Sequence, residues 1–351
     1  LRKKTTIRQL LNLEVSQIFS DAIVNVAILV AQKTGSQGER QTDMARVSNS
    51  TWNSDGFHEF VRSQSFFIPL QHFLSPQWSL EKPEILAVRS KIEIGGRTLK
   101  QMGAKIRLGV ATGCNDAFVI DSAKREELIL EQKASADIIV PVIRGRDVER
   151  YGNLKPSLFL IAAKNGVNIM RDYPAIYGHL HSFGEKFRKR GAQGENWWNL
   201  RACAFYDDFS KDKIVWMELS DKARFTKCQA GVWCLNSAYF LLPPHACSAN
   251  YLLAILNSRA IYFYFKLIAQ TSGMGVPRWI NLYVEQFPIP NAAPQIRTKL
   301  EDMVECILSQ KQSNPKAGTS ALEQEINEAI YRLYGLTDEE IAIVEESTRT
   351  T

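Results

Sequence analysis

The chain has 351 residues, of which 45% are hydrophobic and 23% are charged. This balance is typical of a globular protein with a sizeable core, and it excludes a disordered chain. No apolar run approaches the roughly 20 residues that a membrane-spanning helix needs. The six cysteines form no Cys-x-x-Cys pair and no disulfide framework, so we expect a protein of the reducing cytoplasm.

The net charge of +6 is unevenly distributed along the chain. Residues 296–351 carry a net charge of −5, which leaves +11 for residues 1–295. A basic surface favours a polyanionic partner, and nucleic acid is the commonest one in a cytoplasm. Many cytoplasmic proteins are mildly basic, however, so the charge alone indicates little.

Residues 1–40 have the pattern expected at the end of a domain. Residues 15–19 and 23–31 are rich in β-forming residues, and Ser20 and Asp21 between them are turn-formers. The segment 23–30 is almost continuously hydrophobic, which is typical of a strand covered on both faces. A hairpin alone cannot supply that cover, so we expect it to come from outside this chain.

Residues 41–105 are predicted to be a linker and the first part of a second region. Between residues 106 and 295 the pattern indicates a mixed α+β domain with strands at 106–110, 117–120, 158–162, 213–217 and 238–242. We expect a helix that Asp172 caps and Pro174 opens, with its apolar stripe running on to Phe187, and a second helix from a Ser248 cap to about residue 268.

Residues 296–351 are predicted to be an acidic helical tail. Apolar stripes at helical spacing lie in residues 296–307 and 322–333, and Gly335 is expected to end the second helix. Thr337 and Glu340 have the spacing of a capping box, which predicts a last short helix.

Several strings resemble, in order, the TaqI-like C-terminal specificity domain, the target-recognition part of adenine-specific DNA methyltransferases and restriction-modification fusion enzymes. They are IRLGVATGCNDAFVI at 106–120, IVPVIRGRDVERY at 139–151, WWNLR at 197–201, YLLAILNS at 251–258, FPIP at 287–290 and YRLYGLTDEE at 331–340. One such string would be weak evidence, but the ordered set is specific. The resemblance implies a domain that reads a sequence in double-stranded DNA.

In this family a catalytic domain precedes the recognition domain, and residues 19–30 resemble the last strands of its α/β methyltransferase sheet. The resemblance implies S-adenosylmethionine as the cofactor of the parent enzyme. Adenine methylation needs Asn or Asp, two prolines and an aromatic residue in succession. The only Pro-Pro pair here is Pro243-Pro244, between Leu242 and His245, and no F-x-G-x-G turn occurs. We therefore predict no catalytic, cofactor-binding or metal-binding residue in this chain.

Eleven residues are candidates for DNA contact. Arginine can read guanine edges or clamp phosphates, clustered cations suit the phosphate backbone, and asparagine can pair with adenine. The candidates are Thr112, Asn115, Arg144, Arg146, Arg150, Lys186, Arg188, Lys189, Arg190, Arg201 and Arg278.

Each group of candidates also has a structural interpretation. The arginines of 144–150 are interleaved with Asp147 and Glu149, with which they could form internal salt bridges. Cations are common at helix C-termini, and Asn115 could be only a turn residue. Arg278 lies in a polar stretch, residues 270–279, that could equally connect a helix to a strand.

Other functions stay open at this point. The chain could be one fragment or subunit of an active methyltransferase. It could also be a partner-dependent subunit or a protein-interaction module with no DNA binding of its own. Zinc binding by Cys228, Cys234, His245 and Cys247 is disfavoured because their spacing matches no standard zinc knuckle. A nuclease role for Glu218 and Lys222 fits poorly.

Overall fold

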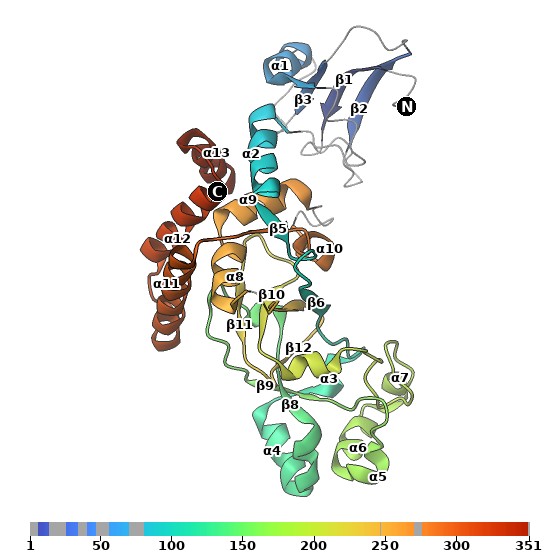
Figure 1. The fold of residues 1–351 in the computed structure, drawn as a ribbon. Helices are drawn as coiled ribbons and strands as arrows, with labels where there is room; N and C mark the ends of the chain where they lie inside the picture. Colours follow the sequence, from blue (N-terminus) through green and yellow to red (C-terminus); the bar gives the residue numbers. More distant parts are fainter. Residues whose placement is uncertain are drawn as a thin grey trace. The chain divides into compact units, whose positions relative to one another are not determined.

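The computed structural model describes residues 6–13, 26–33, 41–46, 56–69, 81–245, 247–269 and 276–349. The chain forms two compact units, one of residues 1–91 and 338–343 and the other of residues 92–337 and 344–351. Figure 1 shows the elements in chain order. No helix in the described ranges is long and apolar enough to cross a membrane. The boundaries predicted from the sequence, at residues 40, 105 and 295, stay predictions, because these two compact units do not test a functional division of the chain.

The first unit contains a four-stranded sheet of order β2-β1-β3-β4. Its strands are β1 (Thr6–Asn12), β2 (Ala27–Gln32), β3 (Gln41–Arg46) and β4 (Ser65–Pro69). The pair β1–β3 is parallel, and β1–β2 and β3–β4 are antiparallel. Helix α1 (Phe57–Gln64) precedes β4, and α2 (Pro83–Ile94) follows it and continues into the second unit.

The hydrophobic strand predicted at 23–31 is described from residue 26 onward. Strand β2 lies at an edge of its sheet, and all six of its residues are exposed. Its apolar side chains Ile28, Leu29 and Val30 are 45%, 38% and 47% exposed. This chain therefore does not cover the strand among its described residues. The strand predicted at 15–19 lies outside them.

The centre of the second unit is formed by two four-stranded sheets. The antiparallel sheet β11-β10-β13-β6 contains β6 (Lys105–Leu108), β10 (Lys213–Met217), β11 (Phe225–Cys228) and β13 (Ala238–Leu242). The mixed sheet β12-β8-β9-β7 contains β7 (Val119–Ile120), β8 (Ile139–Ile143), β9 (Leu158–Ile161) and β12 (Trp233–Cys234). A short pair joins β5 (Gly96–Thr98) to β14 (Pro288–Pro290).

The predicted α+β class is confirmed. The strands at 213–217 and 238–242 have the predicted bounds, and those at 106–110 and 158–162 differ by two residues or fewer. The strand predicted at 117–120 is wrong in its first half, because residues 115–118 form the short helix α3 (Asn115–Phe118) before β7 begins. Ala117 and Phe118 are both buried, so their apolar character did not distinguish a strand from a helix.

Four further helices contribute to the hydrophobic core of the mixed sheet: α4 (Ser122–Glu131), α5 (Ile169–Asp172), α6 (Pro174–His181) and α7 (Gly184–Arg188). The single helix predicted from Asp172 to Phe187 is wrong, because it divides into α6 and α7. Gly184 has φ of +77° at the division, a conformation that glycine adopts without steric cost. Ile176, Leu180 and Phe187 are buried, as the stripe required.

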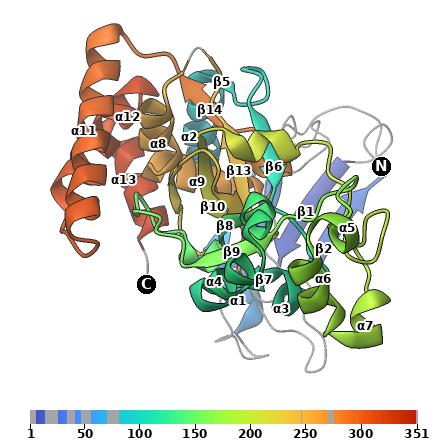
Figure 2. The same cartoon turned by 90° about the horizontal axis from the view of Figure 1, so that it is seen from below.

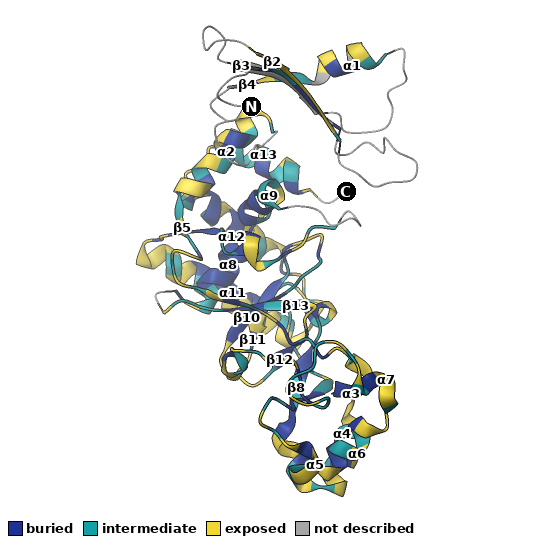
Figure 3. Ribbon diagram, turned by 90° about the vertical axis from the view of Figure 1, so that its right-hand side faces the viewer, coloured by how far each residue is buried: buried dark blue, intermediate teal, exposed yellow. Residues whose placement is uncertain are grey.

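The helix predicted from Ser248 to about residue 268 is also two helices. Ser248 caps α8 (Ala249–Leu256), and Ser258 caps α9 (Arg259–Ile268) by accepting a hydrogen bond from the backbone of Ile261. The apolar spacing alone predicted one continuous helix, but α8 ends at Leu256 and the Ser258 cap begins a new helix. Short helix α10 (Asn281–Val284) follows. Figure 3 shows α8 and α9 as largely buried elements.

The helical tail is confirmed as α11 (Pro294–Ser313), α12 (Ser320–Leu333) and α13 (Asp338–Thr348). Gly335, with φ of +67°, follows the end of α12, as predicted. Helix α13 begins directly after Thr337, where the capping box was expected.

Candidate nucleic-acid interface

Three chain segments run in parallel where the two central sheets meet. Val110 pairs with Leu235 in a parallel bridge, and β12 pairs with β8 in parallel. The carboxyl ends of parallel segments lie at the same edge. The turns at residues 111–115, 144–147 and 236–237 therefore lie together, and we call them the turn edge.

Backbone packing at the turn edge is too close for side chains at two positions. A Cβ on Gly109 would lie 2.2 Å from the carbonyl oxygen of Leu235, and a Cβ on Gly145 would lie 2.1 Å from that of Ser237. The amide of Gly145 donates to the Ser237 hydroxyl at 2.9 Å. Glycine is thus required here because the segments approach each other through their backbones.

Thr112 and Asn115 form the first turn of this edge. The buried Thr112 hydroxyl donates to Oδ1 of Asn115 at 2.7 Å and accepts from the backbone amide of Cys114 at 3.1 Å. Asn115 is exposed, whereas the Thr112 side chain is committed to the turn. Of the two predicted residues, Asn115 is the one available to a partner.

Arg144 and Arg146 belong to the second turn and differ in their contacts. Arg144 donates through Nε and Nη2 to Asp147, with distances of 3.0 and 2.8 Å to the nearest carboxylate oxygens. Burial acts to raise the pKa of Asp147, but its hydrogen bonds with Arg144 outweigh this effect and hold the pKa below its ordinary value. Arg146 is exposed, and no ion pair to it occurs among the described residues. Its charge is therefore available to an anion.

The guanidinium of Arg150 is engaged by hydrogen bonds within the protein. Its Nε donates to Glu323 of α12 at 2.5 Å, and its Nη1 donates to the carbonyl of Asn257. The guanidinium also lies 5.2 Å from the centre of the Tyr151 ring. The side chain joins the strand region to the helical tail, as the structural interpretation of the sequence allowed.

Arg190 holds two loops together. Its Nε donates to the carbonyl of Thr112 at 3.0 Å, its Nη2 donates to that of Asn199 at 2.8 Å, and its Nη1 donates to that of Trp197. The guanidinium lies 4.7 Å and 4.5 Å from the ring centres of Phe118 and Phe187. Burial lowers the pKa of Arg190 to about 10. Arg190 thus connects the loop of residues 191–200 to the turn edge.

Helix α7 presents the remaining cations of this cluster next to α3. The rings of Phe118 and Phe187 lie 5.7 Å apart, and Figures 1 and 2 show the two helices at the same end of the unit. Lys186 is exposed without an ion pair among the described residues, whereas Lys189 pairs with Glu185 at 2.6 Å. Nε of Arg188 is buried and has no hydrogen-bond partner in the described part of the chain.

Arg278 and Arg201 complete the predicted set. Arg278 donates twice to one oxygen of Glu218, at 2.5 and 3.1 Å, and Glu218 is tied to the turn edge by its backbone hydrogen bond to Ser237. Arg201 is exposed, and its side chain has no ion pair among the described residues. Glu218 therefore links Arg278 to the turn edge.

The sequence did not predict the hydrogen bonds that hold the loop of residues 191–200 to residues 164–167. Asn199 is fully buried, and its Nδ2 donates to the carbonyl of Lys164 at 2.8 Å, while Oδ1 of Asn165 accepts from the backbone of Glu195 at 3.0 Å. Trp198 donates from its indole to the carbonyl of Val167 at 3.2 Å. The WWNLR string marked this region in the sequence, but the carbonyl groups that Trp198 and Asn199 contact lie about 30 residues earlier, so the string did not indicate them.

No group of three metal-ligating side chains occurs in the described residues. Cys228 and Cys234 are buried in the core, where burial raises the pKa of both thiols, that of Cys228 to about 11.

Part of the chain matches a known protein family. Residues 140–289 match the family model of the TaqI-like C-terminal specificity domain. A search of curated protein sequences finds no match to the chain. The matched segment contains nine of the eleven predicted residues, and the other two, Thr112 and Asn115, lie before its start. Arg144, Arg146 and Arg150 lie near its start, and Arg278 lies near its end.

Among solved structures, the chain is similar to the Type IIL restriction-modification enzyme MmeI, determined in complex with DNA. The TM-score is 0.60 at 13% identity, over 98% of this chain and 46% of that one. The type IIG restriction endonuclease BpuSI matches with a TM-score of 0.46 at 13% identity, over 93% of this chain and 43% of that one. At this level of identity the MmeI match shows a shared fold, and this chain spans less than half the length of either enzyme.

Proposed function

Because residues 140–289 form a TaqI-like C-terminal specificity domain, we propose that this chain recognises a specific sequence in double-stranded DNA. In this proposal it is the specificity portion of an adenine-specific DNA methyltransferase or restriction-modification enzyme of the cytoplasm. The observation that carries the proposal is the gathering of available groups at the turn edge and along α7. Arg146, Lys186 and Asn115 are all exposed, and the two cations have no ion pair among the described residues.

The available groups suit different parts of a DNA duplex. Exposed lysine and arginine neutralise phosphates, which positions the protein without reading sequence. Arginine can also form paired hydrogen bonds to guanine, and asparagine to adenine. We assign phosphate contact to Lys186 and base reading to Arg146 and Asn115. Arg144 and Arg278 are held by carboxylates, so they orient the turns beside the duplex.

We place catalysis in a separate domain or subunit, which would bind S-adenosylmethionine. The catalytic tetrapeptide and the F-x-G-x-G turn do not occur in these 351 residues. The exposed apolar side chains Ile28, Leu29 and Val30 of β2 support a partner that covers this strand. Burial of such a strand against a catalytic domain would remove this apolar surface from water.

The test is binding of the chain to a random-sequence duplex library over a salt series, followed by sequencing of the bound DNA. We expect one motif to be selected at every salt concentration, while the overall affinity falls steeply as salt rises. The matched variants are Arg146→Ala at the turn edge and Lys316→Ala in the turn between α11 and α12, both of which remove one exposed cation. Only the first should alter the selected motif or the salt dependence.

Weak binding without selection would mean that recognition requires the catalytic partner. The salt series is then repeated with the catalytic partner added, and selection of one motif in its presence would support a recognition that needs both parts. No binding at low salt, with or without the partner, would refute DNA recognition and favour a protein-interaction module.

A further inference from the structure

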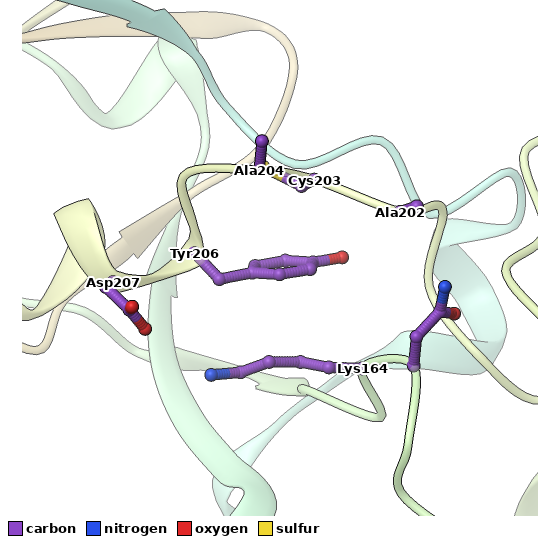
Figure 4. Close-up of a pocket in the computed structure, with 7 residues that line it drawn as sticks. Lys164, Ala202, Cys203, Ala204, Tyr206 and Asp207 are labelled. Carbon is purple, nitrogen blue, oxygen red and sulfur yellow. The ribbon is translucent and has the colours of Figure 1, made fainter.

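A pocket of about 640 Å³ lies beside the loop of residues 191–200. It is lined by Lys164, Asn165, the segment 202–204, Tyr206 and Asp207. Figure 4 shows the Tyr206 ring between the Lys164 side chain and the 202–204 segment. Pockets of a few hundred Å³ hold ligands of the size of a nucleotide.

The Tyr206 ring, which lines this pocket, is held in place by neighbouring aromatic rings and by a hydrogen bond. The Tyr206 ring lies 5.4 Å from that of Trp233 in a stacked arrangement, and Trp233 stacks on Phe209 at 4.5 Å. The Tyr206 hydroxyl donates to the carbonyl of Arg201 at 2.7 Å. A ring held by both its face and its hydroxyl is a preorganised platform, so a ligand that stacks on it would not have to order it first.

Positive charge borders the platform. Nζ of Lys164 lies 5.4 Å and 5.5 Å from the ring centres of Tyr206 and Trp233, and no ion pair joins it to a carboxylate among the described residues. The exposed Arg201 lies one residue before the pocket segment and is likewise without an ion pair in the described ranges. Asn165 and Asp207 add polar groups that can meet the edge of a base.

The pocket and the turn edge are joined by the same loop. The side chain of Asn165 accepts a hydrogen bond from the backbone amide of Glu195. The carbonyl of Asn199 accepts a hydrogen bond from Arg190, and the side-chain amide of Asn199 donates to the carbonyl of Lys164. A ligand in the pocket would therefore contact Asn165, which is hydrogen-bonded to the loop that Arg190 fastens to the turn edge.

We propose that this pocket takes up one unstacked nucleotide of DNA. The base would lie against Tyr206, with Asn165 and Asp207 at its edge, and the phosphate would lie near Lys164 and Arg201. Aromatic platforms bordered by cations are the means by which proteins hold single nucleotides, whereas a phosphate of intact duplex would leave the ring without a role. The inference rests on the proposed function, because it names a second element of the same recognition.

The test uses the motif selected in the salt series, with a single-nucleotide bulge moved along the duplex. A bulged base unstacks at little cost, so we expect tighter binding at one bulge position, on the order of tenfold. Lys164→Met keeps the apolar stem on the rings and removes the charge, and Tyr206→Leu removes the platform. Both variants should lose this gain, whereas Lys316→Met in the tail should keep it, with thermal unfolding as the control for folding.

The outcomes separate this inference from the proposed function. Equal affinity for paired and bulged duplexes at every position, with duplex binding intact, would overturn the pocket alone. If no duplex binds, the proposed function fails, and titration with deoxynucleoside 5′-monophosphates then decides about the pocket. Saturable binding that Lys164→Met abolishes would support a nucleotide site, and no saturable binding of any monophosphate would refute it.

Discussion

The contacts of Arg190 lead to a quantitative prediction for Arg190→Met. This change keeps an apolar stem between the rings of Phe118 and Phe187 and removes the donors to the three carbonyls of Thr112, Trp197 and Asn199. A hydrogen bond within a protein contributes at least about 1 kcal/mol net to stability, and a cation over an aromatic ring contributes about 0.5 kcal/mol. The free energy of unfolding should therefore fall by about 3–4 kcal/mol, which is a large part of a typical stability of about 5–15 kcal/mol.

Urea unfolding gives the total loss, and amide hydrogen exchange shows where it is felt. Exchange should accelerate most in residues 111–115 and 191–200, because these are the loops that Arg190 joins. Arg188→Met is the matched control from the same helix end, since among the described residues the Arg188 guanidinium makes just a 3.4 Å contact with His181 and lies 5.9 Å from the Trp197 ring centre. If Arg190→Met and Arg188→Met lose equal stability, or if the two loops keep their protection, the reasoning about this arginine is refuted.

Three further predictions concern the charges of the interface and the tail. Arg146→Ala should reduce the slope of log affinity against log salt by about 1, whereas Lys316→Ala should leave it unchanged; equal slopes would remove Arg146 from the interface. Asp147 has a folded-state pKa below its ordinary 3.8, so its stabilisation, with Arg144 as partner, is present above that pH and is lost as pH falls through the folded-state pKa. The stability difference between wild type and Asp147→Asn should accordingly shrink in acid, and a constant difference in unfolding titrations would contradict this. Arg150→Met should cost about 2 kcal/mol of stability through loss of its tail contacts while the selected DNA motif stays the same, and a changed motif would show that this residue reads DNA.

The sequence predicted those elements that depend on local chemistry. The strands at 213–217 and 238–242 were located by their β-branched and aromatic residues, and the tail helices by apolar spacing and the glycine at 335. The ordered strings that resemble the specificity domain also pointed to the region that the family model matches, residues 140–289. Helix interruptions were missed at Gly184 and Ser258, because a periodic stripe continues across a break when both helices face the same core.

The sequence by itself thus determined the fold class, the family resemblance and a list of cations that could meet DNA. Only the tertiary structure decided how these cations are used, because a guanidinium is committed or available according to what packs around it. Arg150 and Arg190 are held by carbonyls and a carboxylate that are distant in sequence, at Asn257, Glu323 and Thr112 among others, whereas Arg146 in the same string as Arg150 is exposed. The pocket at Lys164 and Tyr206 is likewise built from two segments about 40 residues apart, and no local pattern marks two such segments as neighbours.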